Sequence, residues 1–114
     1  MTILGIGLDA TDIPRIEKAI ARYGDRFIHR IFTEAEIAYC SGKYRPAPHY
    51  AGRFAAKEAA MKALGTGWAQ GVGFLQIELV RQPSGAPALR LHGEARRRAD
   101  AMGVEELWVS ISHD

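Results

Sequence analysis

Four charged side chains interrupt a helix-like run that is otherwise small and apolar. They are Arg53, Lys57, Glu58 and Lys62. Five of the residues between Phe54 and Leu64 are alanines. Glu58 and Lys62 are four residues apart, so one interpretation is a surface ion pair worth roughly 0.3–0.5 kcal/mol. However, so many small residues favour close packing of this helix against another element. Its charges are then candidates for chemistry.

A second carboxylate, Asp9, ends a segment (2–9) in which apolar residues alternate and two glycines leave little bulk. We expect the small residues of the helix to let Glu58 approach Asp9. Two carboxylates from separate elements suit Mg²⁺, which takes few protein ligands and keeps water and phosphate oxygens. The three basic residues of the helix would then hold phosphates, as phosphoryl transfer requires.

Two further residues could carry chemistry but also have ordinary structural explanations. His113 lies in an alternating segment at the end of the chain. It could donate a hydrogen bond to a phosphate, act as a general base or have a structural role. Cys40 is the only cysteine, which excludes an intrachain disulfide and is typical of a small buried side chain in a reducing compartment. The first residues lack a basic leader, so we expect a cytoplasmic protein with no membrane span.

Composition indicates one globular domain, 1–114, with a modest core. The chain has 114 residues, 47% hydrophobic and 25% charged, with a net charge of +2. A small core predicts help from a neighbouring subunit. The net charge hides two basic stretches, because 15–30 holds five basic and two acidic residues and 43–62 holds five basic and one acidic.

Periodicity, caps and turn residues predict the elements that must position these side chains. Thr33 and Glu36 form a capping-box pattern, and Pro83–Pro87 is typical of a hairpin turn. The order is β-α-α-α-β-β-α-β, an α+β domain with helices against an antiparallel sheet. The expected strands are 2–9, 74–81, 88–92 and 107–113; the expected helices are 13–23, 34–42, 49–64 and 94–102; and 43–48 is expected to be a loop.

Five ordered motifs resemble the holo-[acyl-carrier-protein] synthases of the 4′-phosphopantetheinyl transferase superfamily. The motifs are Gly5-Ile6-Gly7-Leu8-Asp9, Asp12-Ile13-Pro14-Arg15-Ile16, Phe32-Thr33 with Glu36, the run Arg53 to Gly67, and Ser110-Ile111-Ser112-His113. The resemblance covers nearly the whole chain, and the F-x-x-K-E-A-x-x-K helix is the superfamily's signature. It implies Mg²⁺-dependent transfer of 4′-phosphopantetheine from coenzyme A to a serine of apo acyl carrier protein, a step in fatty acid biosynthesis, with release of adenosine 3′,5′-bisphosphate.

The resemblance also implies roles for individual residues. Asp9 and Glu58 match the metal ligands, Lys62 the lysine beside the phosphates, and His113 a histidine near coenzyme A. The expected catalytic residues are Glu58, Lys62 and His113. The expected coenzyme A site comprises Lys43, Arg45, Arg53, Lys62, Gly65 and His113. The expected carrier-protein contacts are Arg15, Arg22 and Arg26. The general base is Glu58, directly or through a metal-bound water, or else water alone.

The family implies a homotrimer with sites at subunit interfaces and no nucleic-acid or membrane partner. Its members continue past the Ser-x-Ser-His motif with another strand, so the sequence to Asp114 is either truncated or lacks the closing strand. The alternative function is a non-catalytic module that binds acidic carrier proteins or nucleotides through the basic helices.

Overall fold

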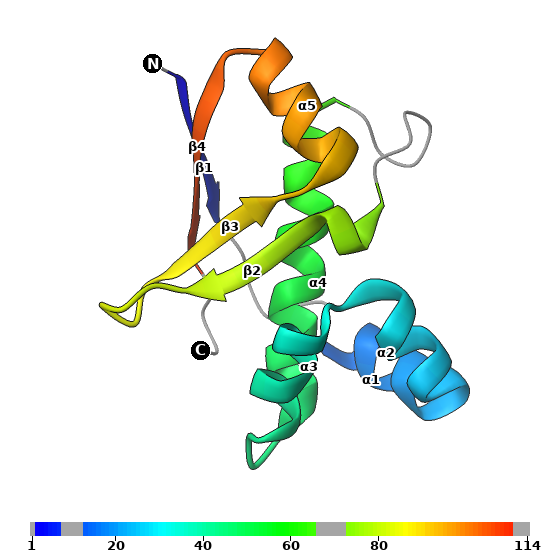
Figure 1. Cartoon of the computed structure of the whole chain (residues 1–114). Helices are drawn as coiled ribbons and strands as arrows, with labels where there is room; N and C mark the ends of the chain where they lie inside the picture. Colours follow the sequence, from blue (N-terminus) through cyan, green and yellow to red (C-terminus); the bar gives the residue numbers. More distant parts are fainter. Residues whose placement is uncertain (1, 8–12, 66–72, 111–114) are drawn as a thin grey trace.

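The chain folds around one long helix, α4 (Pro46–Ala63), which contacts α1, α3, β1 and β2. The computed structural model describes residues 2–7, 13–65 and 73–110. Figure 1 shows α4 passing behind a hairpin, with α1 and α2 towards one end of the molecule and α5 at the other. The other elements are β1 (Thr2–Gly7), α1 (Ile13–Tyr23), α2 (Asp25–Ile31), α3 (Glu34–Ser41), the short 3₁₀ turn η2 (Phe74–Gln76), β2 (Ile77–Arg81), β3 (Pro87–Leu91), α5 (Gly93–Ala101) and β4 (Val104–Ser110). This is the α+β class expected from the sequence.

The strands form two pairs of opposite kind. β2 and β3 make the expected antiparallel hairpin, with Ile77 opposite Leu91 and Arg81 opposite Pro87. β1 and β4 instead run parallel, with Gly5 opposite Trp108 and Gly7 opposite Ser110. The expectation of an antiparallel sheet therefore holds for β2–β3 and fails for β1–β4. A short turn forces the hairpin to be antiparallel, whereas β1 and β4 lie at opposite ends of the sequence and have no such constraint.

Two helical segments differ from the sequence prediction. α2 was not predicted, and it begins after Gly24, whose φ of 57° interrupts the helical path from α1. Its seven residues are too few to be stable alone, so packing of Ile31 in the core stabilises it. α4 begins at Pro46, within the predicted loop, because proline is tolerated in the first turn of a helix.

The predicted capping box at the start of α3 is confirmed, and it leads to a buried ion pair. Glu36 Oε1 accepts a hydrogen bond from Thr33 N (2.8 Å), while Thr33 Oγ1 accepts one from Glu36 N (3.3 Å). The same Oε1 accepts from Lys57 Nζ at 2.6 Å, and both side chains are fully buried. Glu36 Oε2 accepts from Leu79 N of β2 at 2.8 Å. One carboxylate thus joins α3, α4 and β2.

Lys57 completes this arrangement from α4. Its Nζ also donates to Ile31 O (2.9 Å) and Phe74 O (3.0 Å), so all three protons of the ammonium can be used. Burial lowers the pKa of Lys57, and the Glu36 carboxylate opposes this by favouring the charged form. The expectation that Lys57 holds a phosphate is wrong, because its ammonium lies in the interior and is saturated with protein acceptors.

Aromatic side chains of the apolar core pack against α4. Phe54 bridges Phe27 and Phe74, with ring centroids 6.2 and 5.2 Å away. Cys40 is fully buried, as expected for a structural cysteine.

Among the helices in the described ranges, none is long and apolar enough to cross a membrane.

Glu78 links the start of α3 to the end of the hairpin. Its Oε2 accepts from Thr33 Oγ1 at 2.8 Å, and its Oε1 lies 3.1 Å from His92 Nε2. Burial on its own would raise the pKa of Glu78, but the hydrogen bonds from Thr33 and His92 and the nearby charges of His92 and Arg90 outweigh it and lower the pKa.

We predict that Lys57→Met lowers the free energy of unfolding by about 3–5 kcal/mol, because it leaves the Glu36 carboxylate buried without its counter-charge. Urea unfolding followed by circular dichroism measures this loss. Lys62→Met, on the exposed face of the same helix, is the matched control and should change the free energy by less than about 0.5 kcal/mol. Equal losses in the two variants would contradict a bracing role for Lys57.

We predict that Glu78→Gln is less stable than the parent at pH 7 and that this difference shrinks at pH 3. A carboxyl group whose pKa is lower in the folded state stabilises the protein above its unfolded pKa of about 4.5. That stabilisation is lost as the pH falls through the folded pKa. Urea midpoints of both proteins at the two pH values test this, and a difference independent of pH would refute it.

Candidate active site

The two predicted catalytic residues of α4, Glu58 and Lys62, point away from the buried side of the helix that carries Lys57. Glu58 is partly exposed, and Lys62, in the last turn, is exposed. Glu58 Oε1 accepts a hydrogen bond from Arg15 Nη2 of α1 at 3.0 Å. The ion pair of Glu58 is therefore made with Arg15 across two helices rather than with Lys62 along one.

Arg15 lies between two predicted regions of the site. Its guanidinium is 5.2 Å from the centroid of the Phe54 ring, and more than half of its side chain is exposed. The sequence assigned Arg15 to a carrier-protein surface and Glu58 to a metal site. The structure places these two side chains in direct contact, so the two regions adjoin.

The end of α4 has the shape expected from its glycine. Gly65 has a φ of 70°, which a side chain would disfavour, and its N–H donates to Lys62 O at 3.0 Å. Leu64 O accepts from Arg98 Nε of α5 at 3.1 Å. Arg98 is thus a structural contact, whereas its neighbours Arg96 and Arg97 are exposed.

Two of the predicted coenzyme A residues meet at the ring of Tyr39 in α3. Lys43 Nζ is 4.3 Å and Arg53 Cζ is 4.2 Å from the ring centroid, although Arg53 itself is buried. Arg81, at the end of β2, also approaches this ring, with Cζ at 5.3 Å. No sequence motif connects Arg81 with Tyr39, because the two residues lie far apart in the chain.

The remaining predicted coenzyme A residue in this region, Arg45, is the N-cap residue of α4 and is exposed. Asp9 and His113 lie outside the described residues. Within the described parts, no group of three or more histidine, cysteine, aspartate or glutamate side chains could hold a metal ion. Of the two metal ligands that the resemblance implies, only Glu58 therefore lies in the described ranges.

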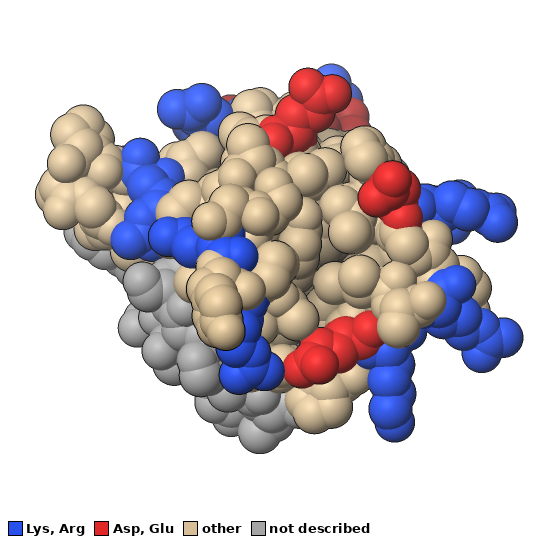
Figure 2. Space-filling model, turned by 90° about the horizontal axis from the view of Figure 1, so that it is seen from below, with Lys and Arg blue, Asp and Glu red and all other residues tan. Residues whose placement is uncertain are grey.

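The basic residues predicted for a carrier protein are exposed on α1 and α2. Arg22 Cζ lies 5.3 Å from the ring centroid of Tyr23, and Arg26 lines a hollow of about 630 Å³ with Tyr23, Phe27 and Arg30. Seen from below, Lys and Arg side chains lie around the edge of the molecule together with Asp and Glu side chains, and the centre of this face is largely uncharged (Figure 2).

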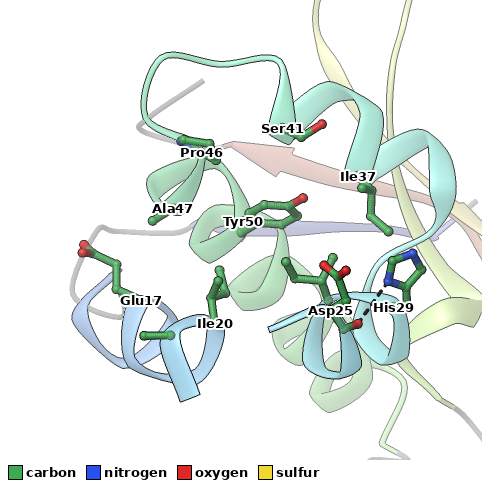
Figure 3. Close-up of a pocket in the computed structure, with 11 residues that line it drawn as sticks. Glu17, Ile20, Asp25, His29, Ile37, Ser41, Pro46, Ala47 and Tyr50 are labelled. Atoms are coloured by element: carbon green, nitrogen blue, oxygen red, sulfur yellow. Dashed lines mark hydrogen bonds between the residues drawn. The ribbon is translucent and has the colours of Figure 1, made fainter. Parts of the chain in front are cut away.

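A second hollow, of about 540 Å³, lies among α1, α2, α3 and α4. Tyr50 lies centrally in it, with Glu17 towards one side and Asp25 and His29 towards the other (Figure 3). His29 Nδ1 lies 3.0 Å from Asp25 O. None of the predicted site residues in the described ranges lines this hollow, so the candidate site is the polar face of α4 and its surroundings.

Comparisons with known proteins identify a family for the whole chain. The family model described as the 4′-phosphopantetheinyl transferase superfamily matches residues 5–111. The holo-[acyl-carrier-protein] synthase of Solibacter usitatus is 49% identical over 111 residues, which cover 97% of this chain and 89% of that protein. The synthase of Maridesulfovibrio salexigens is 50% identical with the same coverage.

Solved structures lead to the same family. The Helicobacter pylori holo-[acyl-carrier-protein] synthase in complex with coenzyme A has a TM-score of 0.74 and 37% identity, covering 90% of this chain and 84% of that one. The Bacillus anthracis synthase in complex with coenzyme A (3′,5′-ADP) has a TM-score of 0.60 and 43% identity, covering 72% and 70%.

The fold and the signature helix therefore define a phosphopantetheinyl transferase domain. Within that class, the chain belongs to the holo-[acyl-carrier-protein] synthase family of the 4′-phosphopantetheinyl transferase superfamily. The resemblance drawn from the five sequence motifs is confirmed.

Proposed function

We propose that this chain transfers the 4′-phosphopantetheine group from coenzyme A to a serine hydroxyl of apo acyl carrier protein. The products are holo acyl carrier protein and adenosine 3′,5′-bisphosphate. The observation that carries this proposal is the family match over 5–111 together with the position of the signature helix, which exposes Glu58 and Lys62 while its Lys57 braces the fold. A rigid helix with an outward-facing carboxylate and ammonium suits phosphoryl transfer.

Glu58, with Asp9, would hold a Mg²⁺ ion that neutralises charge on the pyrophosphate of coenzyme A. Glu58 fits this role because its carboxylate is partly exposed and its bond to Arg15 uses Oε1, so Oε2 can face a cation. Arg15 would hold the carboxylate in one orientation.

In the reaction, the serine oxygen forms a bond to the β-phosphorus, and the bond from that phosphorus to the bridging oxygen breaks in line. Lys62 would stabilise the charge on the departing bisphosphate, and His113 would contact coenzyme A. The serine proton would pass to Glu58, directly or through water, or to water alone.

The coenzyme A nucleotide would bind at the basic zone that residues 43–62 form. Lys43, Arg45 and Arg53 supply three cations for its phosphates, and Gly65 allows the chain to approach the pyrophosphate closely. Arg15, Arg22 and Arg26 would bind the acidic carrier protein. A homotrimer, with sites completed by the neighbouring subunit, and a cytoplasmic location stay predictions from the family.

Incubation with coenzyme A, Mg²⁺ and apo acyl carrier protein should add the mass of phosphopantetheine to the carrier, as measured by mass spectrometry. Glu58→Gln should lower the rate by more than the roughly 10–100-fold that loss of an outer-sphere partner of a metal costs. Glu94→Gln, at an ion pair on α5, is the matched control and should keep full activity. Carrier binding without any mass increment would instead favour a non-catalytic module.

We predict that Arg22→Glu raises KM for the carrier protein roughly tenfold and leaves KM for coenzyme A unchanged, because it reverses a charge that attracts an acidic partner. Arg22 is a cleaner site than Arg15, since a glutamate at 15 would also repel Glu58. Steady-state kinetics with each substrate varied measures both constants. Equal changes in the two KM values would remove α1 from the carrier surface.

A further inference from the structure

Three cations from three separate elements converge on the ring of Tyr39. Lys43 follows α3, Arg53 belongs to α4 and Arg81 ends β2, and their charged groups lie 4.3, 4.2 and 5.3 Å from the ring centroid. The ring's negative face attracts each cation. The three side chains therefore concentrate positive charge around one ring, which favours an anion nearby.

The convergence is built into the fold by the buried carboxylate of Glu36. Tyr39 lies three residues after Glu36, about one turn further along α3. Arg81 lies two residues after Leu79, whose N–H donates to Glu36 Oε2 at 2.8 Å, and alternate residues share one face of a strand. The hydrogen bond between α3 and β2 therefore holds the two elements that carry Tyr39 and Arg81 next to each other.

The three cations differ in how accessible they are. Arg53 is buried and its Nη1 donates to His49 O at 3.4 Å, so its position is restricted. Lys43 is half-buried, while Arg81 is exposed. Arg81 is thus the most accessible of the three cations to a ligand from solvent.

We propose that Tyr39 and Arg81 complete a binding site for a phosphate monoester, with Arg81 as a ligand-contacting residue and Tyr39 as the residue that positions the cations. A terminal phosphate carries nearly two negative charges, and a planar guanidinium can bind two of its oxygens. This inference rests on the proposed function, because in that reaction the monoester is the 3′-phosphate of coenzyme A.

Isothermal titration of coenzyme A and of 3′-dephospho-coenzyme A, each with Mg²⁺, tests the assignment. The parent protein should bind coenzyme A more tightly than the dephospho form. Arg81→Gln should weaken coenzyme A binding roughly tenfold and leave binding of the dephospho form unchanged. Arg96→Gln, which removes an exposed arginine paired with Asp100 on α5, is the matched control and should bind both ligands as the parent does.

Tyr39 is tested by two variants that separate its ring from its hydroxyl group. Tyr39→Phe keeps the aromatic face and should preserve the preference for coenzyme A, whereas Tyr39→Leu should reduce that preference. A merely structural role would weaken both ligands together and leave their ratio unchanged.

The outcomes separate this inference from the proposed function. A parent that prefers coenzyme A, with Arg81→Gln retaining the same preference, overturns the role of Arg81 and leaves the transferase intact. A parent that binds both ligands equally overturns the phosphate site alone. A parent that binds neither ligand and transfers nothing overturns both proposals.

Discussion

The structure depends on one buried ion pair, between Glu36 of α3 and Lys57 of α4. Glu36 closes its own capping box, receives the ammonium of Lys57 and accepts the N–H of Leu79 in β2. Lys57 also binds carbonyl groups at Ile31 and Phe74. These bonds satisfy both charges in the interior, where an unmatched charge would cost several kcal/mol. The relative positions of α3, α4 and the hairpin follow from them.

The ion pair also explains why the adjacent residues Lys57 and Glu58 of the signature helix have different roles. Successive residues of an α-helix point roughly 100° apart, so a lysine turned into the core leaves the following glutamate near the surface. Glu58 is accordingly partly exposed and held by Arg15, and Lys62 follows one turn later. The buried side of α4, with Lys57, thus fixes the position of the helix, and the exposed side presents Glu58 and Lys62.

Local signals were sufficient for much of the fold. The capping box at Thr33, the end of α4 near Gly65 and the β2–β3 hairpin are confirmed, because each depends on residues close in sequence. α2 and the first turn of α4 were missed. A seven-residue helix is stabilised by tertiary packing, and the prolines that suggested a loop are also acceptable in the first turn of a helix. The parallel β1–β4 pairing joins opposite ends of the sequence, where no local rule applies.

By itself, the sequence determined the family and the set of charged residues, since both depend on residue identity and order. Only the tertiary structure decided the role of each charge. It buried Lys57 against Glu36, paired Arg15 with Glu58 and gathered Lys43, Arg53 and Arg81 around Tyr39. A charged side chain has the same letter in solvent and in the core, and its chemistry depends on burial and on partners that the chain brings from distant positions.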